Sequence, residues 1–376
     1  MGSLVGKTQG LSPFPVLDSH IMSAVKPQIK VFWIALLFAS LACRAATRLV
    51  IPDTPTPLPT ATATSTSTAT PTPLPTFTPT VIFEASCPSL VEDILNTVTT
   101  TVHIEERPDE MFHEADGSIS LITYEVADKE ISDPHIDAVP DELEDERDDR
   151  ATHAEIWDYF ASIIPAEQRE FISEFSLFTD GPGNHLAGVS YTFPDPEQWG
   201  LHVDILDAES YHDLTYTLIH EQGHLLTLNA EQVIPSEDVF KLPENKAIYS
   251  RESAACQQYF TGQGCSDPAS YINQFFIRFW PYLYEEWEEI NRENDEQDRS
   301  ILLKEFYRTY ADQFVSEYAA TSPAEDIAEA WAFFLLSPKP ELDSIANEKI
   351  LFFYEYPELV ALRTQILTNI CAEFPQ

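Results

Sequence analysis

Basic residues are scarce in this sequence of 376 residues: 21 Lys and Arg stand against 62 Asp and Glu, a formal net charge of −41. Such an excess of negative charge repels phosphate backbones and anionic lipid headgroups. We therefore expect no nucleic-acid partner, and membrane contact only through an N-terminal signal or lipid anchor. The acidic run 141–149 is predicted to be a solvated loop or helix face. It lacks the D-x-D-x-D-G order of a calcium-binding loop, so a Ca²⁺ site there is an unsupported alternative.

The apolar run near the N-terminus, residues 31–42, is too short for a membrane span, which needs about 20 residues. It follows two lysines and ends in small residues before Cys43, which predicts an export signal over residues 1–43. Its end, ASLAC, resembles the lipobox of bacterial lipoproteins, whose cysteine is lipid-modified, although the usual leucine lies one position nearer the cysteine here. Cleavage near Ala42 without lipid is the alternative, and Met22 is an alternative start of translation.

Residues 52–80 consist mostly of Pro, Thr, Ser and Ala, with no period that could bury a core. We expect residues 44–82 to form an extended, solvated stalk. It would hold the folded residues 83–376 outside the cell, where the protein is either lipid-anchored through Cys43 or secreted. No internal repeat is evident, and we expect a monomer. The folded region divides into an acidic N-terminal part, a part with the sheet and a metal-motif helix, and a helical part: residues 83–150, 151–229 and 230–376.

Four cysteines follow Cys43, and an even number in an exported protein predicts two disulfides. Three pairings are open. The short spacing between Cys256 and Cys265 suggests a local bridge, which leaves Cys87 to join Cys371 near the end of the chain. A four-cysteine zinc site is the alternative, but no C-x-x-C pair is present to support it.

Hydrophobic spacing predicts an α+β fold with a small mixed sheet followed by a mostly helical C-terminal half. Strands are expected between Gly, Pro and Asp turns, at residues 171–178, 186–193 and 199–205. Helices are expected at residues 151–164, 210–229, 270–292, 300–314, 323–336 and 348–371.

The helix predicted at residues 210–229 contains HEQGH at residues 220–224, an H-E-x-x-H motif. Histidines four apart lie on one helix face, so His220 and His224 can bind one ion, and zinc is the metal expected for this motif. Glu221 lies about 100° round the helix, where it can act as a general base on a metal-activated water. The alternative is a core helix with two exposed histidines. The apolar flanks TLI and LLTL disfavour it, because unpaired polar groups are costly to bury.

A catalytic zinc site needs a third protein ligand. In the extended metzincin motif it is a histidine six residues after His224, but Ala230 stands there. The other solution is a glutamate from a later helix, and Glu325 is the candidate. Pro323 fits the first turn of a helix, which places Glu325 and Glu329 four apart on one face. An ordinary acidic amphipathic helix is the alternative interpretation of this stretch.

The motif HEQGH, followed about 100 residues later by Y-x6-E-D-I-A-E-A-W, resembles the gluzincin metallopeptidases, particularly the lethal-factor and Pro-Pro endopeptidase type. The resemblance covers roughly residues 171–336 and implies a zincin-like fold with one catalytic Zn²⁺, with Glu325 as the third ligand. It implies that Glu329 supports a zinc-binding histidine and that Tyr318 donates a hydrogen bond to the developing oxyanion. The neighbouring acidic residues are expected to be surface or cap residues: Glu317 and Asp326.

These expectations describe a zinc-dependent endopeptidase that hydrolyses peptide or protein substrates outside the cell. The expected metal ligands are His220, His224 and Glu325. Zinc would activate a water and polarise the scissile carbonyl, while Glu221 takes the proton and delivers it to the leaving amine. In zincins the sheet edge before the motif helix pairs with an extended peptide, and that strand is expected within residues 186–193 or 199–205.

Two other functions are open. A surface-displayed, non-catalytic zinc-binding or adhesion module could keep a zincin fold, but it would have no need of Glu221. An enzyme of the same design could also cleave a non-peptide amide instead of a peptide bond.

Overall fold

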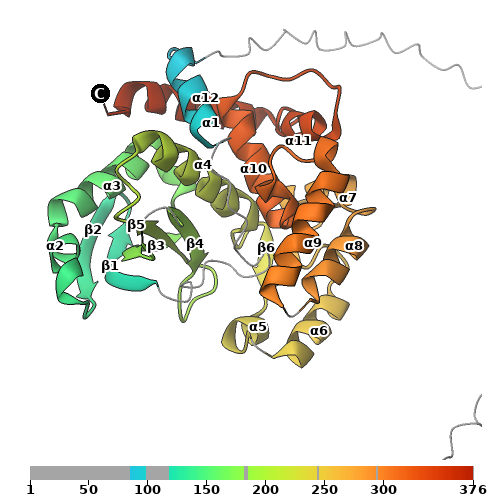
Figure 1. Ribbon diagram of the computed structural model, residues 1–376, viewed down its shortest axis with the longest axis horizontal. Helices are drawn as coiled ribbons and strands as arrows, with labels where there is room; N and C mark the ends of the chain where they lie inside the picture. The colour runs from blue at the N-terminus through green and yellow to red at the C-terminus, as the bar shows by residue number, and fades with distance from the viewer. Residues whose placement is uncertain (1–84, 99–117, 182–184, 244, 294, 376) are drawn as a thin grey trace, which may run out of the picture. The chain divides into compact units, whose positions relative to one another are not determined.

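The computed structural model describes residues 85–98, 118–181, 185–243, 245–293 and 295–375 (Figure 1). The predicted export signal, residues 1–43, and the predicted stalk, residues 44–82, lie outside the described residues. Helices and strands combine in an α+β arrangement, as the sequence predicts. Among the described helices, none is both long enough and apolar enough to cross a membrane.

A five-stranded mixed sheet has the strand order β2-β1-β3-β5-β4 (Figure 1). Its strands are β1 (Ile119–Ala127), β2 (Glu130–Ile136), β3 (Ile172–Thr179), β4 (Ala187–Tyr191) and β5 (Trp199–Asp204). β3 and β5 pair in parallel, and the other neighbours pair antiparallel. The three predicted strands are confirmed as β3, β4 and β5, whereas β1 and β2 lie in the acidic part for which no strand is predicted. β4 forms one edge of the sheet.

Helices cover the sheet and make up the C-terminal half. In the N-terminal half they are α1 (Pro88–Val98), α2 (Glu144–Asp148), α3 (Arg150–Ile163) and α4 (Tyr211–Leu228). In the C-terminal half they are α5 (Glu237–Lys241), α6 (Lys246–Ala255), α7 (Tyr271–Phe279), α8 (Tyr284–Asn291), α9 (Glu296–Thr309), α10 (Pro323–Leu336), α11 (Ile345–Phe353) and α12 (Pro357–Glu373). A two-stranded sheet, β6 (Val233–Pro235) with β7 (Gly264–Ser266), lies between α4 and α7 in the chain.

The predictions of α3, α4 and α10 are confirmed, and α9 begins before the predicted residue 300. Two helix predictions are wrong at internal prolines. The predicted helix 270–292 is two helices, α7 and α8, on either side of Pro281, and the predicted helix 348–371 is divided between α11 and α12 before Pro357. Proline has no backbone N–H to continue a run of helical hydrogen bonds, so neither predicted helix continues through its proline. Before Pro357, Tyr356 is also extended, as expected for a residue that precedes proline.

One face of the five-stranded sheet is apolar and carries helices. Val189, Leu201 and Phe175 lie next to one another across β4, β5 and β3, and all three are buried. Trp157 of α3 packs there, with its ring 5.2 Å from that of Phe175. Helix α4 packs against the edge strand β4 and, on its other side, against α10 (Figure 1). The sheet thus supports α4, and α4 in turn supports α10.

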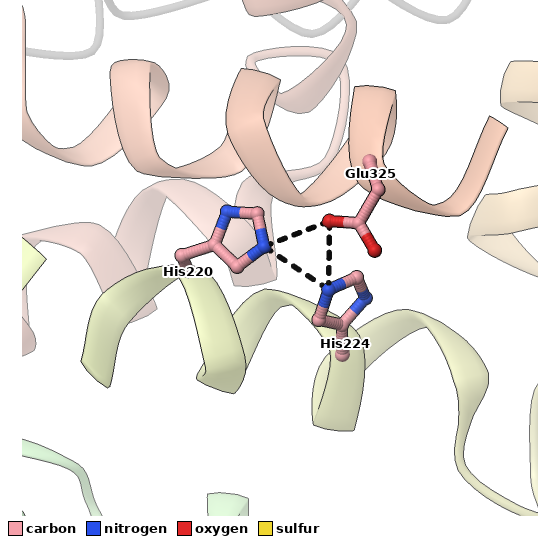
Figure 2. Close-up of side chains that lie close together, drawn as sticks. All are labelled: His220, His224 and Glu325. Carbon is pink, nitrogen blue, oxygen red and sulfur yellow. Dashed lines mark hydrogen bonds and ion pairs between the residues drawn. The ribbon is translucent and has the colours of Figure 1, made fainter. Parts of the chain in front are cut away.

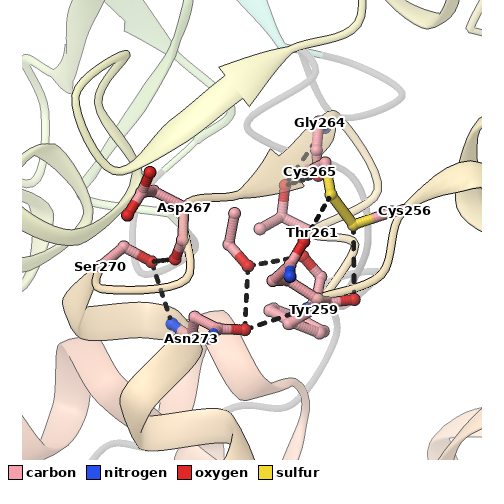
Figure 3. The surroundings of a disulfide bond; sticks show 10 residues. Cys256, Tyr259, Thr261, Gly264, Cys265, Asp267, Ser270 and Asn273 are labelled. Carbon is pink, nitrogen blue, oxygen red and sulfur yellow. Dashed lines mark hydrogen bonds between the residues drawn. A yellow bond between two sulfur atoms is a disulfide. The ribbon is translucent and has the colours of Figure 1, made fainter.

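Both predicted disulfides are present, Cys87–Cys371 and Cys256–Cys265. Figure 3 shows the second one closing a small loop beside α7. The loop is also held by Asn273 of α7, whose side-chain oxygen accepts hydrogen bonds from the Tyr259 backbone N–H (3.1 Å) and from the Ser266 hydroxyl (3.2 Å). This loop therefore has non-covalent support in addition to its disulfide.

His202 makes stability depend on pH. It lies on the opposite face of the sheet from Leu201 and contacts the Ser190 hydroxyl through Nε2 (2.8 Å), and burial lowers its pKa to about 4. Between pH 6.5 and 4 the unfolded chain therefore binds a proton that the folded protein does not, so stability falls as the pH falls. We expect a loss of about 2 kcal/mol between pH 7 and pH 5 from this group, measured by urea unfolding at both pH values.

His202→Gln should remove that part of the pH dependence. His135→Gln is the matched control, because His135 lies exposed on β2. Equal pH slopes for wild type and His202→Gln would contradict the assignment.

Candidate metal centre

Side-chain hydrogen bonds cap both ends of helix α4. The Ser210 hydroxyl accepts a hydrogen bond from the Asp213 backbone N–H (3.4 Å) at the N-terminus. At the other end, the Asn229 side-chain amide donates to the Leu225 carbonyl (2.7 Å). These contacts satisfy backbone groups that a helix end leaves without partners inside the helix.

The second half of α4 is enclosed by other elements, and all of residues 218–228 are buried. His220 is 5% exposed and His224 is 8% exposed. The interpretation of α4 as a core helix with two exposed histidines is therefore wrong. Two buried imidazoles require partners, because an unpaired polar group in a core is costly.

The close contact between α4 and α10 is made at Gly223. A Cβ atom at this position would lie 3.0 Å from Cδ1 of Trp331 and 3.1 Å from Cα of Ala328. Beside it, the Trp331 indole N–H donates to Oε1 of Gln222 (2.6 Å). Glycine here lets the two helices approach closely enough for their polar side chains to meet.

His220, His224 and Glu325 converge between these helices (Figure 2). Nε2 of His220 lies 3.1 Å from Nε2 of His224 and 3.0 Å from Oε2 of Glu325, and the third distance, from His224 Nε2 to Glu325 Oε2, is 3.2 Å. In a tetrahedral zinc site with bonds of 2.0–2.1 Å, ligand atoms lie about 3.3 Å apart. The three atoms thus form a triangle slightly smaller than that of zinc ligands, and the group could hold one metal ion.

Glu329 supports His220 from the side away from the other two ligands. Its Oε1 accepts hydrogen bonds from Nδ1 of His220 (2.9 Å) and from the Tyr216 hydroxyl (3.0 Å), and its Oε2 accepts one from the Ser316 hydroxyl (2.5 Å). A proton on Nδ1 leaves the lone pair of Nε2 available for a metal ion. The structure therefore joins Glu329 of α10 to His220 of α4 by a hydrogen bond.

The histidines and glutamates of this buried group shift one another's pKa values. Burial by itself would lower the pKa of His220, but the hydrogen bonds and charges of Glu325 and Glu329 outweigh it and raise that pKa well above its ordinary value. Burial would raise the pKa of Glu325, but His224 and His220 hold it well below its usual range. The group thus favours a positive charge among its ligand atoms, and protons compete with a metal ion for them.

The two residues expected to act on substrate lie on the elements that carry the three converging side chains, Glu221 on α4 and Tyr318 just before α10. Glu221 follows His220 on α4 and is buried. Tyr318 begins a 3₁₀ turn, η4 (Tyr318–Ala320), just before α10, and its ring centroid lies 5.6 Å from that of His220. The structure thus brings five of the six residues that the sequence singles out into one group of contacts, namely His220, His224, Tyr318, Glu325 and Glu329. The sixth, Glu221, is buried on α4 next to His220 in the sequence.

Asp326 differs from the prediction. The sequence predicts a surface or cap residue, but Asp326 is fully buried, 2.6 Å from Nζ of Lys349 and 2.8 Å from the donating Nε1 of Trp280. Lys349 is equally buried, so the pair fixes α10 against α11 and α7. Glu317, the other residue expected at the surface, is only partly buried. One feature of the sequence does indicate a buried ion pair: Lys349 is a single cation next to the apolar end of α11.

Sequence reasoning did not identify two donors to Glu329. Tyr216 lies one turn before His220 on α4, and Ser316 lies two residues before Tyr318. Hydroxyl side chains are common in any sequence, so only the three-dimensional position of Glu329 marks them as part of the site.

A second group of acidic residues lies at the carboxyl ends of β3 and β5. Asp180, Asp204 and Asp207 bring carboxylate oxygens within 4.8 Å of one another. Asp204 accepts hydrogen bonds from the backbone N–H groups of Asp180 (2.9 Å) and Leu206 (2.8 Å), and burial raises its pKa to about 6. These contacts give Asp204 a structural part in joining the two strand ends. Among the described residues, no such group falls in the acidic run 141–149, which forms α2 and an exposed 3₁₀ turn, η1 (Asp141–Leu143).

A scan against protein-family models and searches of curated proteins and of solved structures gave no match. The case for a function therefore rests on the residues of the site and on their geometry.

Proposed function

We propose that this protein is a zinc-dependent endopeptidase of the gluzincin type that acts outside the cell. The observation that carries the proposal is the convergence of two imidazole nitrogens and one carboxylate oxygen, 3.0–3.2 Å apart, with Glu221 adjacent in the chain. Two histidines and a glutamate, with a fourth position left for water, are a ligand set of catalytic zinc. The two disulfides support an oxidising environment outside the cytosol.

Each residue of the site has a chemical part in peptide hydrolysis. When bound by His220, His224 and Glu325, zinc would supply Lewis-acid polarisation and a lowered pKa of water. Glu221 takes the proton of the attacking water and gives it to the leaving amine. Tyr318 donates a hydrogen bond to the oxyanion of the tetrahedral intermediate.

The order of elements supports a zincin-like fold. A mixed sheet with an antiparallel edge strand precedes the motif helix, and a helical half supplies the third ligand. Of the two strands expected to pair with substrate, β5 lies inside the sheet and β4 lies at its edge. An extended peptide would therefore pair with β4 through backbone hydrogen bonds, next to α4.

Zinc content tests the proposal directly. We expect one zinc per chain in the purified folded protein, and a loss of affinity of more than about 100-fold in Glu325→Ala, because only two protein ligands remain. Elemental analysis and competition with a chelator measure both quantities.

Glu317→Ala is the matched control, because it removes a glutamate from the same segment but not from the ligand group. His224→Ala should repeat the loss from the other helix. A folded wild-type protein that takes up no zinc when zinc is supplied would overturn the proposal.

A further inference from the structure

We propose that Ser316 is a positioning residue that couples the turn carrying Tyr318 to the metal ligands. The inference rests on the proposed function, because it concerns the same site. In this proposal, the Ser316 hydroxyl fixes the position of Tyr318, the oxyanion donor, relative to the imidazole of His220. Neither the H-E-x-x-H motif nor the glutamate motif of α10 contains this residue.

Ser316 makes two hydrogen bonds that point in different directions. Its hydroxyl donates to Oε2 of Glu329 (2.5 Å) and accepts from the Ala319 backbone N–H (3.0 Å). A serine hydroxyl has one donor hydrogen and two lone pairs, so both bonds form at the same time. Because Ala319 is inside the turn η4, the hydroxyl holds this turn against the carboxylate.

The carboxylate of Glu329 continues the connection to the metal ligands. Its other oxygen accepts from Nδ1 of His220 (2.9 Å), so a chain of three hydrogen bonds runs from Ala319 through Ser316 and Glu329 to His220. Glu329 is 3% exposed, and hydrogen bonds to a buried carboxylate are charge-assisted and stronger than neutral ones. The chain is therefore a stiff connection.

A ring contact also joins Tyr318 directly to His220. Tyr318 lies against His220 with an interplanar angle of 49°. The far end of the turn is fixed separately, because the Thr321 hydroxyl donates to the Tyr318 carbonyl (2.7 Å) and the Trp287 indole donates to the Thr321 carbonyl (2.6 Å). Ser316 thus sets how the turn lies relative to the imidazole, while Thr321 and Trp287 hold its far end in place.

The test compares Ser316→Ala with wild type in two measurements that need no substrate. Chelator competition should show zinc affinity reduced by about 10-fold. Loss of a residue that supports a metal ligand by hydrogen bonding typically lowers metal affinity about 10- to 100-fold, and we expect the lower end of that range. Hydrogen exchange of the Ala319 amide should become about 10-fold faster or more, because its acceptor is gone. In wild type, zinc should slow this exchange, and in Ser316→Ala it should not.

Three variants make the result specific. Ser316→Thr keeps the hydroxyl and should restore both properties. Ser337→Ala removes a hydroxyl that bonds a backbone carbonyl at the other end of α10, and should change neither. Tyr216→Phe removes a different donor from Glu329 without touching η4, so it should lower zinc affinity and leave the Ala319 exchange rate as it is.

Peptide hydrolysis is the third measurement. At saturating zinc, kcat of Ser316→Ala should fall about 10- to 100-fold with KM within about twofold of wild type, because the lost alignment acts in the transition state. If Ser316→Ala behaves like Tyr216→Phe in affinity and exchange, or like wild type in both, the coupling is overturned. If wild type binds zinc but hydrolyses no peptide, the endopeptidase proposal fails, and the affinity and exchange results still decide the coupling.

Discussion

Replacing Glu221 with glutamine is expected to lower kcat for peptide hydrolysis by about 10²- to 10⁴-fold while one zinc stays bound. Glutamine has nearly the same shape as glutamate, but it cannot accept the proton of the attacking water and return it. Glu221 is buried beside His220 and is not one of the three converging ligands, so the metal site should stay intact. Steady-state kinetics and zinc analysis of the same preparation give both results.

Glu231→Gln is the control for this substitution. Glu231 is an exposed glutamate just after α4, so its replacement removes the same charge away from the site. Equal hydrolysis by wild type and Glu221→Gln would contradict the catalytic part of Glu221 and favour the non-catalytic zinc-binding module. Testing peptides and cell-wall amides side by side would separate peptide hydrolysis from cleavage of a non-peptide amide.

The disulfide Cys87–Cys371 is expected to contribute more to stability than Cys256–Cys265. The two bonds join residues that are 284 and 9 positions apart. A crosslink removes conformational freedom from the unfolded chain, and the loss grows with the logarithm of the loop length. Changing Cys87 and Cys371 to serine should cost about 5 kcal/mol, and the same change at Cys256 and Cys265 about 3 kcal/mol.

Urea unfolding of the two double variants measures this difference. The contrast should be reinforced by the surroundings of each bond, because Asn273 holds the small loop by hydrogen bonds after its disulfide is removed. Equal losses in the two variants would contradict the account in terms of loop length.

The parts of the site that the sequence predicts well are those encoded within a few residues. Ser210 and Asn229 bound α4 through contacts three to four residues away, and Ser322 with Pro323 starts α10 in the same way. Such signals are local, so they can be read without knowing the fold. The H-E-x-x-H spacing is local as well, which is why both histidines are found on one face.

Most other long-range relations are visible only in the structure. Glu325, 105 residues after His220, is predicted only through its motif and the family resemblance, and no local signal shows that Asp326 is buried against Lys349 of a different helix. The strands β1 and β2 also depend on contacts between residues distant in the sequence. Their residues lie in an acidic stretch, and only pairing with β3 shows that Leu121 and Ile122 belong to the core.

The contact at Gly223 defines how this site can be found in other sequences. An alanine there would require Trp331 and the backbone at Ala328 to yield by a few tenths of an ångström, and a larger side chain would move α10 away and separate Glu325 from the histidines. A chain built with the same contact between helices will therefore carry H-E-x-G-H, a narrower pattern than H-E-x-x-H. Combined with S-x-Y-x6-E-x3-E for residues 316–329, it gives a longer sequence signature for this contact between α4 and α10.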